Sequence, residues 1–306
     1  MRVLVLGAGG MLGHTLIDLL AGRPGLDVAG TIRDPAPPAA HRTGTTPVTI
    51  HPGIDVARPG TLDALLDDVR PDVIVNAVGI VRQVAAGNDP IATIELNALL
   101  PHRLARLAAA QRARLIQVST DCVFSGRRGG YTEDDAPDPV DLYGRTKLLG
   151  EVVDGDALTI RTSVVGHELA TRHGLVEWFL AQTGTVPGYS RAVFSGLPTV
   201  ELARVIADEV LPRPTLRGLF HVGAAPIAKL DLLALVADRY AARATLEPRD
   251  EPVIDRSLDA RRFTDATGYR APAWPDLVAA MHDDAVARYG ERFRASAQAR
   301  VAPPSR

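Results

Sequence analysis

The chain has 306 residues, 46% hydrophobic and 23% charged, which is enough for one α/β domain with a smaller lobe. Its formal net charge of -2 gives no overall attraction to nucleic acid or to an anionic membrane, so neither is expected as a partner. The single Cys122 excludes an intrachain disulfide, and no Cys/His spacing predicts a metal site. No apolar run approaches the ~20 residues of a membrane span, so we expect a cytoplasmic protein.

The N-terminal segment predicts a dinucleotide-binding unit. Val3–Leu6 is a short, continuously apolar strand, and a helix follows it after three glycines at three-residue intervals. Such glycines let the backbone approach a pyrophosphate, while the N-terminus of the helix offers free N–H groups. The residues expected to hold this part of the cofactor are Gly7, Gly10, Met11, Leu12 and Gly13.

The next strands predict contacts with the adenosine half of the cofactor. Arg33 directly follows the strand Val28–Ile32, where an arginine pairs with a 2′-phosphate and an acid accepts the 2′-OH. Arg33 therefore favours NADPH, and the adjacent Asp34 leaves NADH possible. Asp55 and Val56, in a further stretch with strand character, are expected beneath the adenine.

A fourth strand, Asp72–Val75, ends in polar and small residues at the sheet edge where doubly wound folds bind ligands. The candidates there are Asn76, Ala77, Val78 and Gly79. A helix over 91–110 is interrupted by Pro101, which cannot donate to the carbonyl of Asn97. The sequence therefore predicts a kink, with Asn97 as a further polar contact to the cofactor.

The stretch from Ser119 to Lys147 carries the candidate chemistry. The strand Arg114–Val118 delivers Ser119 and Thr120, and a helix over about 139–152 places Tyr143 and Lys147 on one face. A hydroxyl that faces a Tyr/Lys pair suits acid–base chemistry on a carbonyl.

The strand–helix rhythm predicts an α/β fold with a Rossmann-type doubly wound parallel sheet over residues 1–165. A segment near 196–212 is a candidate to return to this domain. Residues 166–290 are expected to form mainly a smaller, substrate-binding lobe, and 291–306 a disordered tail.

In this order and spacing, the glycines, Ser119-Thr120-Asp121 and Tyr143-x-x-x-Lys147 resemble the extended short-chain dehydrogenase/reductase superfamily. Within it the chain resembles the dTDP-4-dehydrorhamnose reductase group. The supporting stretches are 119–126, 131–133, 142–151, 158–163, 196–199 and 218–222. The resemblance implies an NADPH-preferring oxidoreductase that reduces a nucleotide-linked 4-keto-6-deoxy sugar.

The resemblance also implies catalytic roles. Tyr143 would give a proton to the ketone oxygen, and Thr120 would hydrogen-bond that oxygen. Lys147 would lower the pKa of Tyr143 from its ordinary value of about 10 and hold the nicotinamide ribose.

Two departures affect the substrate. Where the reductase group usually has Tyr and Trp in the sugar pocket, this chain has Cys122 and Val164. The candidate substrate-binding residues are Asp121, Cys122, Val123, Phe124, Val164 and His167.

Two other functions and one assembly stay open. A nucleotide-sugar 4-epimerase would reuse Thr120, Tyr143 and Lys147 with a tightly held NAD. A non-catalytic, cofactor-binding regulatory subunit would keep the fold without the reaction, since a fold does not fix a function. A homodimer is a possible assembly.

Overall fold

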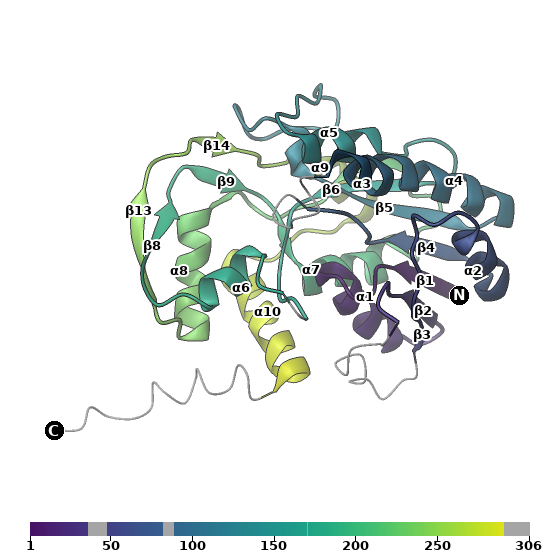
Figure 1. Cartoon of the computed structure of the whole chain (residues 1–306). Coiled ribbons are helices and arrows are strands. Elements are labelled where there is room, and N and C mark those ends of the chain that lie inside the picture. The colour runs from purple at the N-terminus through teal and green to yellow at the C-terminus, as the bar shows by residue number, and fades with distance from the viewer. Residues whose placement is uncertain (36–47, 82–88, 170, 291–306) are drawn as a thin grey trace.

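The computed structural model describes residues 1–35, 48–81, 89–169 and 171–290. Its centre is a seven-stranded sheet in which every pair of neighbouring strands is parallel (Figure 1). The strands in order across the sheet are β11 (Gly218–His221), β6 (Leu158–Thr162), β5 (Arg114–Thr120), β4 (Val73–Asn76), β1 (Arg2–Leu6), β2 (Asp27–Thr31) and β3 (Thr49–His51). The order runs outward from β1 in both directions, so the predicted doubly wound α/β fold is confirmed.

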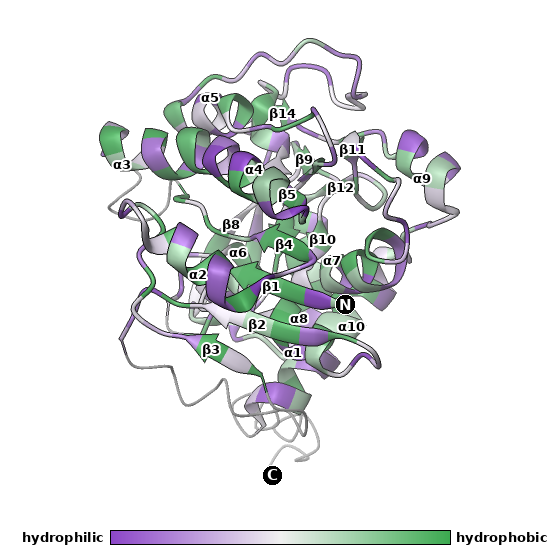
Figure 2. Cartoon of the chain, turned by 90° about the vertical axis from the view of Figure 1, so that its right-hand side faces the viewer, coloured by the Kyte–Doolittle hydropathy of each residue, from purple (hydrophilic) through white to green (hydrophobic). Residues whose placement is uncertain are grey.

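The apolar strands are buried on both faces. Val3 and Val5 of β1 belong to one core, and Leu4 and Leu6 belong to the other, because successive side chains of a strand point to opposite faces. Helices cover each face, and Figure 2 shows the apolar strand centres between them. They include α1 (Met11–Ala21) and α7 (Thr199–Arg204) over one core, and α2 (Thr61–Val69) and α4 (Leu100–Gln111) over the other.

The helical stretch before Pro101 contains a π-helical turn. It runs as α3 (Pro90–Ile94), the turn η3 (Glu95–Leu99) and α4, with Leu100 N–H donating to the carbonyl of Glu95. The helix therefore continues through Pro101, and the wider turn before it absorbs the disturbance where we expected an interruption. The carbonyl of Asn97 faces Gly150, where an added Cβ would overlap it.

A smaller lobe lies to the left of the sheet in Figure 1. Its short strands are β7 (Val164–Val165), β8 (Gly184–Tyr189), β9 (Ala192–Phe194), β10 (Leu197–Pro198), β12 (Ile227–Ala228), β13 (Ala244–Arg249) and β14 (Ile254–Asp255). Its helices are α6 (Leu175–Leu180), α8 (Lys229–Tyr240) and α10 (Trp274–Tyr289), whereas α9 (Arg261–Thr267) packs against β11 of the main sheet. The sequence predicts turns over 187–198 and irregular chain over 249–263, where the structure has β9, β10 and β14. Strands of two or three residues are too short to show an alternating pattern in the sequence.

Residues beyond 165 return to the main sheet. β11 pairs with β6 as the edge strand, and α7, with the π-helical turn η5 (Val205–Val210) after it, packs beside α1. The sheet domain therefore draws on residues after 165. α7 and η5 fall within the segment near 196–212 that the sequence named as a candidate to return, whereas β11 lies beyond it. The predicted tail, 291–306, lies outside the described residues.

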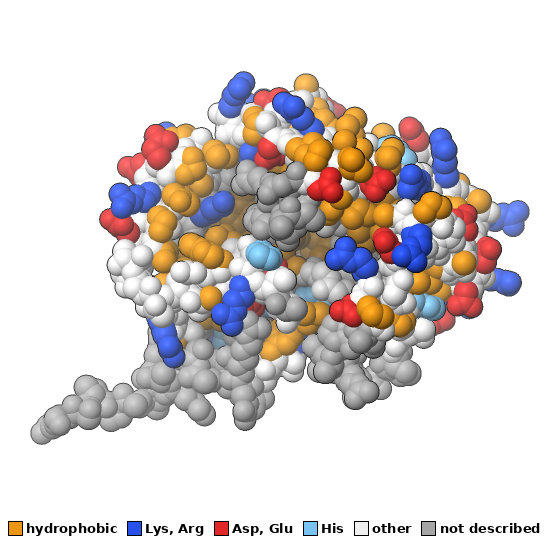
Figure 3. Space-filling view, in the orientation of Figure 1, with side chains coloured by type: hydrophobic (Ala, Val, Ile, Leu, Met, Phe, Trp, Pro, Cys, Tyr) orange, Lys and Arg blue, Asp and Glu red, His pale blue; other side chains and the backbone are white. Residues whose placement is uncertain are grey.

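Charges of both signs are interspersed over the face shown in Figure 3. Among the described helices, none combines the length and apolar character needed to cross a membrane.

Candidate active site

The glycine turn after β1 is tightly packed. Gly7 has a φ of 83°, which only glycine adopts readily, and its N–H donates to Thr31 Oγ1 over 3.2 Å. Gly10 N–H donates to the Gly7 carbonyl over 2.9 Å. A Cβ on Gly13 would overlap that same carbonyl oxygen. The missing side chains therefore let α1 begin directly against the end of β1.

The start of α1 is suited to an anion. Gly10 caps the helix without a side chain, so no side chain of the cap competes for the N–H groups of the first turn. Gly9 and Gly10 are exposed, and the positive end of the helix dipole adds to these donors. The turn fits the pyrophosphate of a dinucleotide. Met11 and Leu12, expected in the turn before the helix, are the first two residues of α1.

The structure places the adenosine-side candidates beside the same edge. Arg33 is exposed just after β2. Asp55 is half-buried and its carboxylate accepts the Ala57 N–H over 3.1 Å, while Val56 is buried. The expected strand geometry at Asp55 and Val56 is wrong, because β3 ends at His51 and the Asp55 carboxylate begins a turn.

Asn76 is a support for the loop that follows it. The side chain is buried, and its Nδ2 donates to Gln117 Oε1 on β5 over 2.7 Å. Its Oδ1 accepts the Val78 N–H over 3.1 Å. Both ends of the amide are thus used within the protein, and Ala77, Val78 and Gly79 provide the surface of this edge.

Asn97 is likewise occupied by the protein itself. Its Oδ1 accepts the Ile80 N–H and its Nδ2 donates to the Ile80 carbonyl, both over 2.9 Å. The same Nδ2 lies 3.5 Å from Thr146 Oγ1 on α5 (Leu142–Leu149). Asn97 is 1% exposed, so the expected direct contact with a cofactor is corrected to a bracing role. It joins the loop after β4 to the helix that carries Tyr143 and Lys147.

Thr120, Tyr143 and Lys147 come together as the sequence predicts. Asp141 caps α5 by accepting the Gly144 N–H over 2.8 Å. A Cβ on Gly144 would overlap the carbonyl of Cys122, so this glycine lets α5 approach the turn after β5 closely. The Thr120 hydroxyl lies close enough to the Tyr143 phenol to lower the pKa of that phenol.

Lys147 lies one helical turn after Tyr143 on α5. Its ammonium is buried and donates to the Val118 carbonyl over 2.7 Å. Burial lowers the pKa of Lys147 to about 8, and the charge of Glu151 opposes that shift.

The structure corrects the expected effect of Lys147 on Tyr143. Burial raises the pKa of the Tyr143 phenol well above its ordinary value, and the nearby Cys122 raises it further. The neighbouring Thr120 hydroxyl lowers the pKa and is the weaker influence. Tyr143 therefore holds its proton at neutral pH.

Two of the candidate substrate residues, Asp121 and Cys122, directly follow Thr120 in the chain. Burial raises the pKa of Asp121, whose Oδ1 accepts the Thr120 hydroxyl over 3.2 Å. Cys122 is half-buried, and burial raises the pKa of its thiol to about 12, so it is no thiolate nucleophile at neutral pH. Val164 is half-buried in β7.

Val123 and Phe124 do not face a ligand. Both are 0% exposed, and together with Tyr131 and Leu258 they form a small core of their own. The Phe124 ring stacks on Tyr131 with centroids 4.2 Å apart. The prediction that these two residues line the substrate is therefore corrected, because their side chains fill the interior of the loop.

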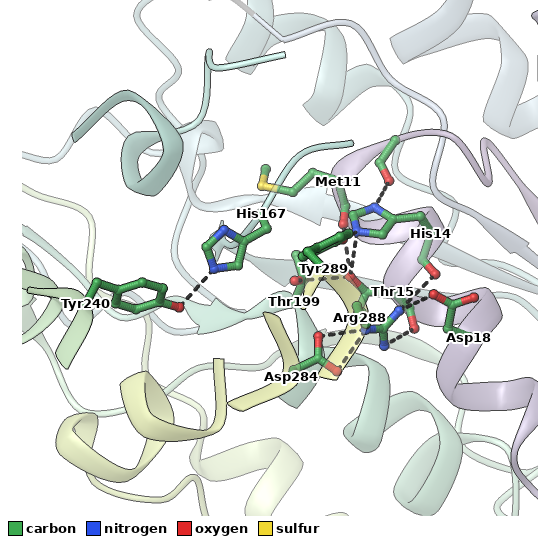
Figure 4. A network of polar contacts seen from close by, with 11 residues as sticks. Met11, His14, Thr15, Asp18, His167, Thr199, Tyr240, Asp284, Arg288 and Tyr289 are labelled. Carbon is green, nitrogen blue, oxygen red and sulfur yellow. Dashed lines mark hydrogen bonds and ion pairs between the residues drawn. The ribbon is translucent and has the colours of Figure 1, made fainter. Parts of the chain in front are cut away.

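His167 is also turned inward. Its Nδ1 lies 2.7 Å from Glu177 Oε1 and its Nε2 lies 2.9 Å from the Tyr240 hydroxyl, all three side chains being buried. Figure 4 shows the imidazole directed at Tyr240 of α8. The expected contact between His167 and a substrate is corrected to a link within the smaller lobe.

A connection between the glycine turn and α10 is not predicted by the sequence. His14 Nδ1 lies 2.8 Å from the Gly10 carbonyl, which only accepts, and His14 Nε2 lies 2.5 Å from the Tyr289 hydroxyl (Figure 4). In a neutral imidazole Nδ1 therefore donates and Nε2 accepts from Tyr289. Burial raises the pKa of Tyr289 to about 12, so this hydroxyl keeps its proton. A histidine one turn into a helix carries no signal that would have revealed this partner.

A buried ion pair between Arg161 and Glu151 is not predicted by the sequence either. Arg161 of β6 binds Glu151 through two bonds, Nε to Oε1 over 2.8 Å and Nη2 to Oε2 over 2.7 Å. The Ser119 hydroxyl donates to the same carboxylate over 2.7 Å. Burial and the charge of Arg161 lower the pKa of His221, on β11, to about 4. Glu151 and Arg161 lie in two of the motif stretches, 142–151 and 158–163. Their opposite charges were the only sign in the sequence that the two residues could pair.

The family model described as RmlD substrate binding domain matches residues 1–283. The chain belongs to this family. The assignment confirms the resemblance to extended short-chain dehydrogenase/reductases of the dTDP-4-dehydrorhamnose reductase type.

The chain is similar to relatives with different names. Methionine adenosyltransferase 2 subunit beta of Rattus norvegicus is 30% identical over 252 residues, which cover 70% of this chain and 73% of the rat protein. A dTDP-4-dehydrorhamnose reductase of Burkholderia thailandensis is 34% identical over 170 residues, 54% of this chain and 50% of that protein.

A crystal structure of dTDP-4-dehydrorhamnose reductase from Bacillus anthracis in complex with NADP has the same fold. Its TM-score is 0.76 at 18% identity, with 92% of this chain and 99% of that one covered.

Within the described ranges, no group of three or more His, Cys, Asp and Glu side chains is placed to hold a metal ion.

Proposed function

We propose that the chain is an NADPH-preferring reductase of a nucleotide-linked 4-keto-6-deoxy sugar. The observation that carries the proposal is the proximity of Thr120 and Tyr143, with the buried Lys147 one helical turn further along α5, at the same sheet edge as a glycine turn that fits a dinucleotide. The family and its reductase members support the same reaction.

The cofactor would be held by this chain in two places. The glycine turn and the first turn of α1 receive the pyrophosphate, and Arg33, exposed after β2, pairs with the 2′-phosphate. When bound, the reduced dinucleotide supplies a hydride to the ketone carbon.

Tyr143 supplies the matching proton. Because burial keeps its phenol neutral at pH 7, Tyr143 Oη holds the proton that the ketone oxygen needs as the hydride arrives. Thr120 donates to the same oxygen, which stabilises the negative charge that develops on it. Lys147 compensates the phenolate that remains, and its lowered pKa makes that help dependent on pH.

A non-catalytic regulatory subunit is the second candidate. It is favoured by the relatives that cover most of the chain, which are named as subunits of methionine adenosyltransferase 2. The presence of Thr120, Tyr143 and Lys147 in one cluster favours the reductase over it. A 4-epimerase would use the same three residues with an NAD that is not consumed.

The test is to mix the purified protein with NADPH and a panel of nucleotide-linked 4-keto sugars and to follow NADPH absorbance. We expect substrate-dependent oxidation, and Tyr143→Phe should reduce it at least a hundredfold while NADPH still binds. Tyr189→Phe, in a half-buried tyrosine of β8, is the matched control and should leave turnover unchanged. NADPH binding without turnover of any sugar would favour the subunit, and co-purified, unconsumed NAD would favour the epimerase.

Cofactor preference is tested separately by the change Arg33→Ala. Loss of a guanidinium–phosphate pair should weaken NADPH binding about tenfold or more and leave NADH binding nearly unchanged. Arg270→Ala, at another exposed arginine, is the control for general loss of positive charge. Equal effects of Arg33→Ala on both cofactors would contradict the role of Arg33.

A further inference from the structure

His14 lies between the glycine turn and the last described helix. Its Nδ1 is 2.8 Å from the Gly10 carbonyl, and its Nε2 is 2.5 Å from the hydroxyl of Tyr289 at the end of α10. The His14 side chain is buried in α1. The imidazole therefore joins the turn that fits a pyrophosphate to a residue 275 positions later in the chain.

The Gly10 carbonyl accepts two hydrogen bonds from His14. The backbone N–H donates over 3.1 Å, as in any helix, and the imidazole adds the second bond. This carbonyl and the Met11 N–H belong to one planar, trans peptide unit, so they point in opposite directions. Holding the carbonyl along the helix therefore directs the Met11 N–H outward, as a donor of the first turn that an anion can use.

The second bond requires one particular tautomer of the imidazole. A carbonyl oxygen only accepts, so Nδ1 has to carry the proton, and Nε2 of the neutral ring then has to accept. The Tyr289 hydroxyl is placed to donate to Nε2. The Thr15 hydroxyl is farther from Nε2, at 3.5 Å, and it donates to the Met11 carbonyl over 3.3 Å. Tyr289 thus favours the tautomer that binds Gly10.

Arg288, the neighbour of Tyr289, anchors the end of α10 on α1. Its guanidinium pairs with Asp18 of α1 and with Asp284 one turn earlier on α10. The Arg288 side chain is 10% exposed, so these ion pairs are largely shielded from water. Figure 4 shows them beside the bond between Tyr289 and the imidazole. The Tyr289 hydroxyl is therefore held in place against α1.

Resting on the dinucleotide binding proposed above, we propose that Tyr289 is a positioning residue for the cofactor and acts through His14. Its hydroxyl fixes the tautomer in which Nδ1 is the donor, and Nδ1 holds the Gly10 carbonyl so that the Met11 N–H faces the pyrophosphate. A helix of the smaller lobe thereby completes the glycine turn of the sheet domain. NADPH and NADH share the pyrophosphate, so both should depend on Tyr289, whereas Arg33 should affect NADPH alone.

The tautomer is measured in the protein without cofactor. Nitrogen NMR spectra of protein labelled at histidine distinguish a protonated from an unprotonated ring nitrogen, and the signals lost in His14→Asn identify His14. We expect the proton on Nδ1 in wild type and a mixture of both tautomers in Tyr289→Phe. A wild-type His14 with its proton on Nε2 would overturn the proposal, as would an unchanged tautomer in Tyr289→Phe.

Titration with NADPH and with NADH measures the effect on the cofactor. Tyr289→Phe removes the hydroxyl and keeps the ring, whose centroid lies 6.2 Å from that of His167. Loss of the ordering provided by one hydrogen bond should weaken both cofactors alike, by about three- to tenfold. Unchanged affinity for both would contradict the proposal. A loss confined to NADPH would also contradict it, because that pattern places the effect at the 2′-phosphate.

Tyr240→Phe is the matched control. It removes another bond between a tyrosine and a histidine, the one from Tyr240 to His167 Nε2 at 2.9 Å, which lies away from the glycine turn. Both cofactor affinities should stay at the wild-type level in this variant, even if its stability falls as much as that of Tyr289→Phe. Equal weakening in the two variants would overturn the proposal, since that pattern marks a general structural role.

The variant His14→Asn separates the tautomer from other effects of Tyr289. The amide nitrogen of asparagine takes the position of Nδ1 and is always a donor, so no tautomer has to be selected. Adding Tyr289→Phe to His14→Asn should therefore cause no further loss of NADPH binding. A further loss as large as that in the wild-type background would show that Tyr289 does not act through His14, and would overturn the proposal.

The same measurements separate this proposal from the function on which it rests. Where a 4-keto sugar is turned over, Tyr289→Phe should raise the KM for NADPH and leave kcat at saturating NADPH unchanged. Cofactor binding that depends on Tyr289 in a protein that turns over no such sugar would contradict the reductase and leave the role of Tyr289 standing. Turnover with an unchanged KM for NADPH in Tyr289→Phe would contradict the role of Tyr289 alone, and a wild-type protein that binds neither cofactor would contradict both.

Discussion

Replacing Arg161 by methionine should destabilise the protein strongly. The change removes both guanidinium bonds to Glu151, at 2.8 and 2.7 Å, and leaves that carboxylate with the Ser119 hydroxyl as its remaining donor among the contacts described above. The two side chains are 4% and 6% exposed, so water cannot replace the lost donors. Methionine keeps most of the volume and adds no new polar group.

The magnitude follows from the number of bonds and their burial. Removing one partner of a buried ion pair costs about 3–5 kcal/mol, because the other charge stays buried without compensation. An exposed pair gives the comparison: Arg217 lies 3.2 Å from Asp156, with the two side chains 60% and 79% exposed. Arg217→Met should therefore cost less than about 1 kcal/mol.

Urea unfolding followed by circular dichroism measures both losses, provided that the slope of the transition is unchanged. The double variant Glu151→Met with Arg161→Met should be more stable than Arg161→Met alone, because it buries no charge. If Arg161→Met lowers the unfolding free energy no more than Arg217→Met does, the reasoning is refuted. A double variant as unstable as the sum of the two single variants would show that packing, and not the stranded charge, sets the cost.

Three further predictions follow from the site. Gly13→Ala should abolish NADPH binding and cost more than about 2 kcal/mol in urea unfolding, because its Cβ would overlap the Gly7 carbonyl. Gly22→Ala, where the nearest atom would be 3.6 Å away, should change neither. Lys147 is a cation below its pKa of about 8, so kcat/KM for NADPH oxidation should fall tenfold per pH unit above that value; a flat profile to pH 9.5 would contradict its role. His221 takes up a proton near pH 4 when folded and near 6.5 when unfolded, so acidification between these values should cost roughly 3 kcal/mol of unfolding free energy. His221→Asn should flatten that dependence, and an unchanged pH profile would count against it.

The sequence predicted those parts of the site that depend on short spacing. Gly7 and Gly13 were recognisable because a close backbone approach demands glycine, and Tyr143 and Lys147 because a four-residue interval puts them on one helical face. Thr120 followed from its place at the end of an apolar strand. Each of these inferences needs only a few neighbouring residues.

The remaining parts depend on contacts that no local pattern encodes. Asn97 was expected to face a ligand, but Ile80 and Thr146 occupy its amide from two other segments. Phe124 was expected in the sugar pocket, yet it packs against Tyr131 in a core formed by the loop itself. The pKa of Tyr143 was expected to fall because a lysine lies one turn away, and burial, which is a property of the folded chain, decided the opposite.

The connection from His14 to Tyr289 has a consequence for how the protein is made. Protein synthesis delivers the N-terminal segments first, and domains form as their chain becomes available. The glycine turn, Thr120 and Tyr143 are all synthesised in the first half, whereas the Tyr289 hydroxyl that binds His14 comes 275 residues after it. Arg256, whose Nε donates to the Phe124 carbonyl, comes 132 residues after Phe124. A nascent chain that has already formed β1 to β6 therefore still lacks the supports of its own active site, which is completed among the last events of synthesis.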